Sequence, residues 1–303
     1  MTFNDDSQLS GGKVKRRGRT AGIAGGGVGI AGIVVFLIAQ FTGVDLSGVV
    51  GGDGSDGSDG LSTIQQGGDQ ASPVAECRTG RYANASIDCR MEGAAESLDT
   101  YWSSEARQLG ISDYATPDFF LFSGSTDTAC GTASASTGPF YCPPDRALYL
   151  DTAFYDDLQS TYGASGGSLA QMYVVAHEWG HHIQQLEGTF ADTDRSGTGA
   201  SSGSVRVELQ ADCYAGAWVG DAASTKSANG TTFFEPVTRD QVADALSAAS
   251  AVGDDSIQER ATGRVDPDSF THGTSEQRQN WFERGYEQGA ERCDTLTVPA
   301  SSL

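Results

Sequence analysis

The chain has 303 residues, with 40 acidic against 19 basic side chains and a formal net charge of -21. Such an acidic surface repels phosphate, which excludes nucleic acid as a partner. About 220 residues follow position 75, enough for one domain with a hydrophobic core.

A basic N-terminus precedes a long uncharged stretch. Residues 13–19 hold five Lys and Arg side chains, and residues 20–44 carry no charge and are rich in Ile, Val and Phe. A stretch of this length can span a bilayer, and its basic flank favours a cytoplasmic N-terminus. We therefore predict a cytoplasmic basic segment (1–19), a transmembrane helix (20–44) and a single-pass cell-membrane protein. A cleaved secretory signal is the alternative, although no clear cleavage site ends the stretch.

Residues 45–75 are dominated by Gly, Ser and Asp and contain few apolar side chains. Such a composition cannot offset the entropy of ordering, so it predicts a disordered linker. The folded, extracytoplasmic domain is then expected over residues 76–303.

All six cysteines follow the predicted membrane segment, in a compartment that would be oxidising. They form no Cys-x-x-Cys pair, which favours disulfides over a zinc ribbon or a thioredoxin-like site; buried free thiols are the alternative. Six cysteines allow fifteen connectivities. The pairs Cys130–Cys142 and Cys213–Cys293 would tie down a turn-rich loop and the C-terminus respectively.

The hydrophobic pattern predicts an α+β domain with a small sheet followed by several helices. A helix is expected over 92–109, and strands over 118–122 and 147–151. Further helices are expected over 152–162, 168–187, 204–221, 238–251 and 275–289.

The helix over 168–187 contains the sequence His177-Glu178-Trp179-Gly180-His181. His177 and His181 are one turn apart on one helix face, so both imidazoles can bind one zinc ion. Glu178 lies beside them, in position to act as general base on the attacking water. Two histidines satisfied within a core are the alternative interpretation.

A catalytic zinc site needs a third protein ligand. Glu187, six residues after His181, is not preceded by the glycine that a sharp turn would need, so it is expected to be a surface acid. Glu208 is the better candidate, and Asp212, one turn later, can accept the outer N–H of a ligand histidine.

Four blocks together resemble the neutral zinc metallopeptidase family of bacteria. They are HEWGHHIQ (177–184), VELQADCYAGAW (207–218), GPFYCPPDRALYLD (138–151) and THGTSEQRQNWFERGY (271–286). The resemblance covers roughly residues 77–294. It implies a membrane-anchored zincin-like domain with His177, His181 and Glu208 as metal ligands and Glu178 as the catalytic residue.

Three further residues are candidates for supporting roles. His272 precedes the last helix and could donate to the oxyanion formed on a peptide carbonyl, or serve as a capping histidine. His182 points away from the face of His181 and is expected to support the site or lie at the surface. Arg278 could pair with an acid near the site. The strand 147–151 is expected to be the sheet edge along which an extended peptide pairs.

These features predict a membrane-anchored, extracytoplasmic endopeptidase that binds one zinc ion per chain and acts on peptide or protein substrates. Two alternatives remain at this stage. One is a non-catalytic cell-surface module with a structural zinc, which would have no need of Glu178. The other is a zinc amidase acting on cell-wall peptides, which would use the same residues.

Overall fold

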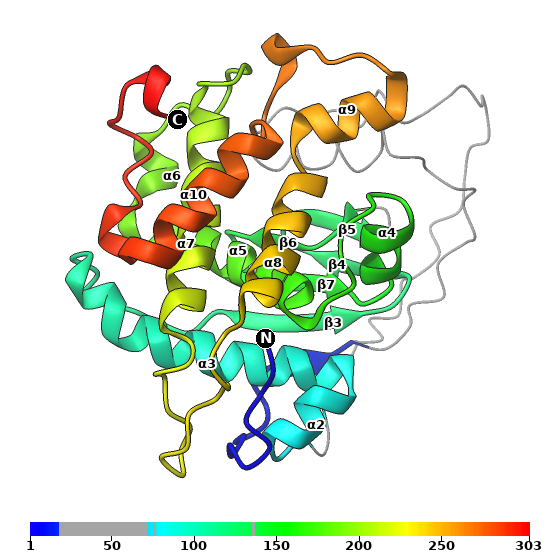
Figure 1. The fold of residues 1–303 in the computed structure, drawn as a ribbon, viewed down its shortest axis with the longest axis vertical. Coiled ribbons are helices and arrows are strands. Elements are labelled where there is room, and N and C mark those ends of the chain that lie inside the picture. The colour runs from blue at the N-terminus through cyan, green and yellow to red at the C-terminus, as the bar shows by residue number, and fades with distance from the viewer. Residues whose placement is uncertain (18–71, 75–76, 135–136) are drawn as a thin grey trace, which may run out of the picture.

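The computed structural model describes residues 1–17, 72–74, 77–134 and 137–303 (Figure 1). The predicted α+β class is confirmed, and each predicted helix is present with its ends shifted by a few residues at most. The main helices are α2 (Gly80–Ala85), α3 (Ile87–Gln108), α4 (Phe154–Ser160), α5 (Ser168–Glu187), α6 (Thr189–Asp192), α7 (Gly203–Asp221), α8 (Arg239–Ala251), α9 (Asp254–Thr262) and α10 (Ser275–Gln288). Single 3-10 turns occur at Pro267–Ser269, Ala290–Arg292 and Ala300–Ser302.

The larger sheet has the strand order β2-β1-β3-β7-β6. Its strands are β1 (Val14–Arg16), β2 (Ser72–Pro73), β3 (Asp118–Phe122), β6 (Phe140–Cys142) and β7 (Ala147–Asp151). The expectation that 147–151 forms the sheet edge is wrong, because β6 pairs antiparallel with β7 and covers it. Strand β6 is only three residues long, too short for its pattern to be recognised in the sequence.

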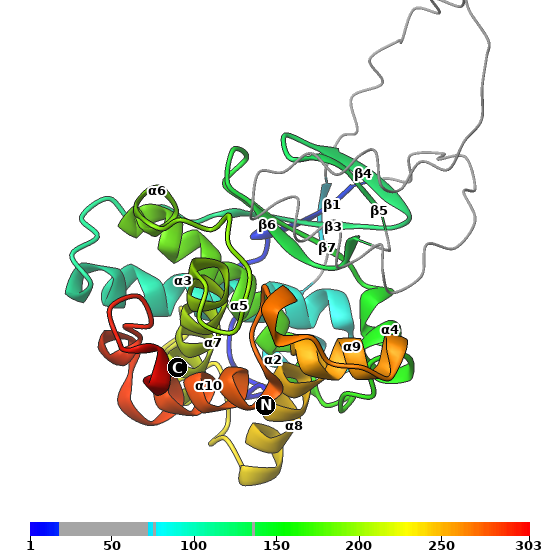
Figure 2. The ribbon, with the colours of Figure 1, turned by 90° about the horizontal axis from the view of Figure 1, so that it is seen from above.

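Successive side chains of the sheet point to opposite faces, and each face is covered. Phe119, Leu121 and Leu148 belong to the main core beneath the helices, which Figure 2 shows gathered on one side of the sheet. Phe120 and Tyr149 form a second cluster with Ala133. Ala133 lies on β5 (Gly131–Ser134), which forms a separate hairpin with β4 (Ser125–Thr128). The sheet is therefore a central layer, and its helical face positions α5.

Helices α7 and α10 pack at close range. A Cβ atom at Gly216 would lie 1.9 Å from the carbonyl oxygen of Phe282, and one at Gly285 would lie 1.8 Å from that of Cys213. Glycine is thus required at both crossing points. The contact carries the start of α10, with Arg278, to the side of α7 that faces α5.

The N-terminal residues belong to the same folded body as the rest of the chain, which corrects the predicted separation of 1–19 from the domain. Strand β1 pairs in parallel with β3, and Val14 is fully buried. The backbone N–H groups of Lys13 and Val14 donate to the carboxylate of Glu92 at 2.8 and 2.7 Å. Three of the basic side chains that suggested a membrane flank form ion pairs with the acidic domain, Lys13 with Asp99, Lys15 with Asp118 and Arg16 with Asp88.

A single-pass arrangement is not supported, and residues from 1–17 pack into the same core as the domain. The predicted transmembrane helix (20–44) and nearly all of the predicted linker (45–75) fall outside the described residues. Within the described ranges, no helix is both long enough and apolar enough to cross a membrane.

Three disulfides close the framework. Both pairs suggested by the sequence, Cys130–Cys142 and Cys213–Cys293, are present. The third joins Cys77 to Cys89 at the start of α3. Cys213–Cys293 connects the middle of α7 to the segment that follows α10, so it fastens the C-terminal helix onto a helix of the candidate site.

Candidate metal centre

Helices α5 and α7 bring His177, His181 and Glu208 to one point. Nε2 of His177 lies 3.2 Å from Oε2 of Glu208, and Nε2 of His181 lies 3.5 Å from Oε1. One ligand atom from each residue lies within 4.8 Å of the others. All three side chains are buried. Two imidazole nitrogens and a carboxylate with this spacing suit a tetrahedral zinc ion that keeps one position for water or substrate.

A glycine permits the close packing of the two ligand helices. A Cβ atom at Gly180 would lie 3.0 Å from Cα of Ala211, which is closer than side chains normally approach. The small residue between the two histidines therefore lets α7 come near enough for Glu208 to reach the ligand atoms of α5.

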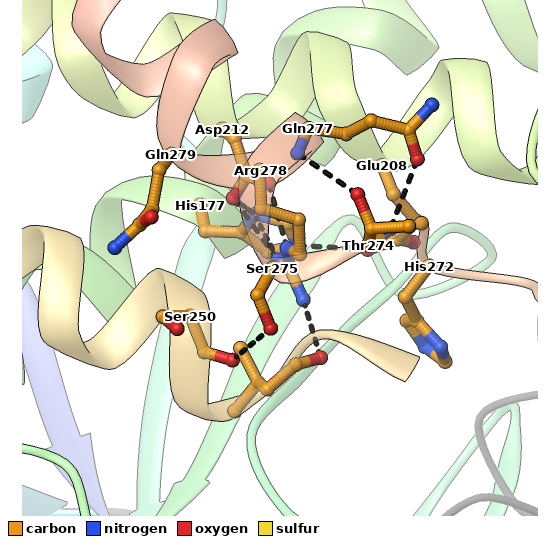
Figure 3. A network of polar contacts seen from close by, with 12 residues as sticks. His177, Glu208, Asp212, Ser250, His272, Thr274, Ser275, Gln277, Arg278 and Gln279 are labelled. Atoms are coloured by element: carbon orange, nitrogen blue, oxygen red, sulfur yellow. Dashed lines mark hydrogen bonds and ion pairs between the residues drawn. The ribbon is translucent and has the colours of Figure 1, made fainter. Parts of the chain in front are cut away.

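Asp212 lies behind His177, on the side away from the cavity. Its Oδ1 is 2.8 Å from Nδ1 of His177 and also accepts the hydroxyl of Tyr173. Arg278 donates to both oxygens of Asp212, from Nε at 2.7 Å and from Nη2 at 3.0 Å (Figure 3). The hydrogen bond between Asp212 and Nδ1 of His177 fixes the imidazole so that its Nε2 points to the metal position.

Gln184 does the equivalent for His181, a role that was not predicted from the sequence. Its amide oxygen is 2.8 Å from Nδ1 of His181. Its amide nitrogen donates to the carbonyl of Val207 at 2.7 Å and to Gln210 at 3.0 Å, both on α7. Gln184 thus orients one ligand and joins the two ligand helices. Its position one turn after His181 was the available signal.

Glu178 is half-buried at the wall of the same cavity. Burial raises the pKa of its carboxyl group to about 7, although the backbone N–H of Tyr141 donates to it and opposes that rise. The contact with Tyr141 places the carboxylate against β6, the edge strand of the sheet. A carboxyl group beside the metal position, with a pKa raised by burial to about 7, is suited to exchange a proton with a reacting water.

His272 reaches the cavity from the loop before α10 (Figure 3). Helix α10 itself begins with a capping box between Thr274 and Gln277. The buried carboxylate of Asp254 holds this loop. Its Oδ2 accepts three backbone N–H groups, those of Thr271, His272 and Gly273 at 2.7, 2.6 and 3.0 Å. Its Oδ1 lies 3.2 Å from Nδ1 of His272. That contact leaves Nε2 of the ring as the atom available to a substrate.

Burial alone would lower the pKa of His272, but the carboxylates of Asp254 and Glu208 together raise it by more, so the pKa lies above its usual value. For His181 the effect of burial dominates, and its pKa falls to about 4, which keeps the imidazole neutral as a metal ligand must be. The pKa of Glu208 is lowered, because the three histidines around it outweigh the effect of burial. Burial also disfavours the charged form of Asp212, but Arg278 lowers its pKa below the usual value.

His182 and Glu187 lie outside the ligand group. Nε2 of His182 is 2.7 Å from the carbonyl of Ala115, and its Nδ1 is 2.9 Å from the hydroxyl of Tyr141. His182 therefore fastens β6 to α5. Glu187 accepts the hydroxyl of Tyr214 at 2.7 Å, and burial raises its pKa to about 7. It is a partly buried carboxyl group at the end of α5.

One cavity unites the candidate residues. Its lining includes His177, Glu178, His181, Glu208 and His272. The ligand atoms, the half-buried carboxyl group and the imidazole from the opposite loop therefore face a common space. In chemical terms, this arrangement could hold a metal ion beside a cavity.

Comparison with known proteins agrees with this arrangement. The family described as "Putative neutral zinc metallopeptidase" matches residues 3–296. The chain belongs to this family. The match begins within the N-terminal segment that packs on the domain, so the family unit includes that segment.

Relatives occur in distant bacteria. An uncharacterized protein of Mycobacterium tuberculosis is 44% identical over 227 residues, which cover 74% of this chain and 76% of the relative. The uncharacterized protein YpfJ of Escherichia coli is 36% identical over 274 residues, covering 88% and 86%. No solved structure matches the chain significantly.

Proposed function

We propose that this protein is a zinc-dependent endopeptidase, with Glu178 as general base and His272 as the donor to the oxyanion. The observation that carries the proposal is the shared cavity, in which three ligand side chains, Glu178 and His272 face one another. A purely structural zinc would be enclosed by four protein ligands. Among the described residues, the ligand group has three members and borders a cavity.

His177, His181 and Glu208 would hold the metal, oriented by Asp212 and Gln184. Zinc, when bound, would lower the pKa of a water molecule and polarise the scissile carbonyl. Glu178 accepts the proton of the attacking water and passes it to the leaving amine. His272, oriented by Asp254, donates from Nε2 to the oxygen that becomes negatively charged. Arg278 balances the charge of Asp212 behind the ligands.

The substrate is proposed to be an extended peptide that lies along the free edge of β6. Tyr141 on this strand contacts Glu178 through its backbone and His182 through its side chain, so the strand and the zinc helix keep a fixed relation. The three disulfides support a location in an oxidising compartment outside the cytoplasm.

The test compares the full chain with Glu178→Gln and Glu208→Ala for metal content and hydrolysis of a peptide library. Glu178→Gln is expected to keep its metal and to lose hydrolysis by about a hundredfold or more. Glu208→Ala is expected to lose both. Glu187→Gln, an acid on the same helix outside the cavity lining, is the matched control and should cleave like wild type. Undiminished cleavage by Glu178→Gln would overturn the proposal.

A further inference from the structure

The cavity beside the metal ligands is apolar away from the ligands themselves. Its interior volume is about 90 Å³. Its apolar lining comes from four parts of the chain: α4 and the loop after it, α5, the α8–α9 junction and the segment before β6. The residues are Pro139, Phe154, Tyr162, Val174, Val252 and Ile257.

The guanidinium group in the lining, that of Arg278, is already paired. Arg278 donates to both carboxylate oxygens of Asp212, and its Nη1 donates to the carbonyl of Val252 at 3.0 Å. A substrate carboxylate in this cavity would therefore have to compete with Asp212 for the guanidinium. A polar side chain would lose its hydration without gaining equivalent hydrogen bonds, which is unfavourable. An apolar side chain would instead gain from burial.

The apolar wall lies next to the residues that would act on the scissile bond. Val252 and Ile257 flank Asp254, and Asp254 holds the loop that carries His272. Val174, which lines the same cavity from α5, precedes His177 by one helical turn and is 8% exposed. The apolar surface therefore begins next to the groups that would act on the carbonyl. A side chain that fills it belongs to a residue directly beside the bond to be cleaved.

We propose that this cavity selects a large apolar side chain, such as Leu, Ile, Met or Phe, on one residue flanking the scissile bond, with Ile257 and Val174 setting its size. The proposal rests on the proposed peptidase function. It adds a substrate class, namely peptides with a bulky apolar residue at the cleavage point.

The first experiment maps cleavage sites in a peptide library with the full chain. Leu, Met or Phe should exceed Ala, Asp and Lys at one flanking position by about tenfold or more in kcat/KM. Ile257→Phe, which narrows the cavity, should shift the preference toward Val and Ala, and Ile257→Ala should favour Phe. Val265→Phe, at an apolar residue that is 43% exposed after α9, is the control and should leave the preference unchanged.

The second experiment measures binding without hydrolysis. The Glu178→Gln variant, loaded with zinc, is titrated by calorimetry with two peptides that differ only in Leu against Asp at the selected position. Tighter binding of the Leu peptide, lost in the Glu178→Gln/Ile257→Phe double variant, supports the proposal even if no peptide is cleaved. Equal binding of both peptides, or cleavage without an apolar preference, overturns it and leaves the peptidase function standing.

Discussion

The metal centre and the N-terminal segment both depend on buried carboxylates, but the partners differ. At the metal centre, Asp212 is paired with the guanidinium of Arg278 and the imidazole of His177. Beside β1, Glu92 accepts two backbone N–H groups, from Lys13 and Val14. Burial disfavours the charged form of both, yet the pKa of Asp212 is lowered by Arg278, whereas that of Glu92 is raised.

This difference in partners gives the two carboxylates different roles. A cationic partner keeps a buried carboxylate charged, so Asp212 can polarise a ligand histidine. Backbone donors satisfy a carboxylate and fix the path of the chain, which is a task of folding. The loop of His272 combines both, because Asp254 binds three backbone N–H groups and one imidazole. Mutations at these acids should therefore differ in what they damage.

The largest effect is expected for Asp212→Ala. Arg278 would be left as a buried, unpaired charge, which costs about 3–5 kcal/mol of unfolding free energy, and zinc affinity should fall about tenfold to a hundredfold. Denaturant unfolding and zinc competition measure the two. Asp212→Leu combined with Arg278→Leu should recover most of the stability but not the zinc affinity. A loss of stability below about 1 kcal/mol in Asp212→Ala would contradict the claim that Arg278 depends on Asp212 for charge compensation.

Glu92→Ala should damage only the fold. The backbone N–H groups of Lys13 and Val14 would lose their acceptor, at about 1–3 kcal/mol each, whereas zinc affinity and kcat/KM of the folded protein should stay at wild-type values. Glu105→Ala, on the same helix at a carboxylate that contacts Gln108 at the surface, is the control. Undiminished stability in Glu92→Ala would mean that β1 does not contribute to the domain.

Asp254→Asn should reduce kcat/KM by about tenfold to a hundredfold, because the amide no longer orients His272 as the carboxylate does. The decrease should fall on kcat rather than KM, and zinc content should stay the same. The same change made in a His272→Ala background should add little further loss. Additive losses in that double variant would show that Asp254 acts on the fold alone.

The smallest effect is expected at Glu187, whose carboxyl group accepts hydrogen bonds from the hydroxyls of Tyr214 and Thr189. Burial raises its pKa from 4.5 to about 7, so its contribution to stability declines as pH rises from about 4.5 to about 7. Glu187→Gln should therefore melt at a higher temperature than wild type at pH 8, with the gap closing toward pH 4. A gap of the same size at pH 4 and pH 8, measured by thermal unfolding, would rule out this titration.

The sequence by itself determined the local part of the site. The relative positions of His177, Glu178 and His181 are set within one helix. Those of Glu208 and Asp212 are set within a second helix. The capping box between Thr274 and Gln277, which begins α10, is likewise a local feature. These features are decided within a turn or two of helix, where spacing along the chain equals spacing in space.

Only the tertiary structure decided which distant groups meet. Gln184 acquires its role because α7 supplies Val207 and Gln210 as partners, and Asp254 acquires its role because the His272 loop folds over it. The sequence of residues 13–17 predicted a charged membrane flank, because a single apolar residue, Val14, among basic ones does not indicate a strand. Their ion pairs and the acceptor Glu92 come from α3 and β3, and no pattern within the segment itself could reveal them.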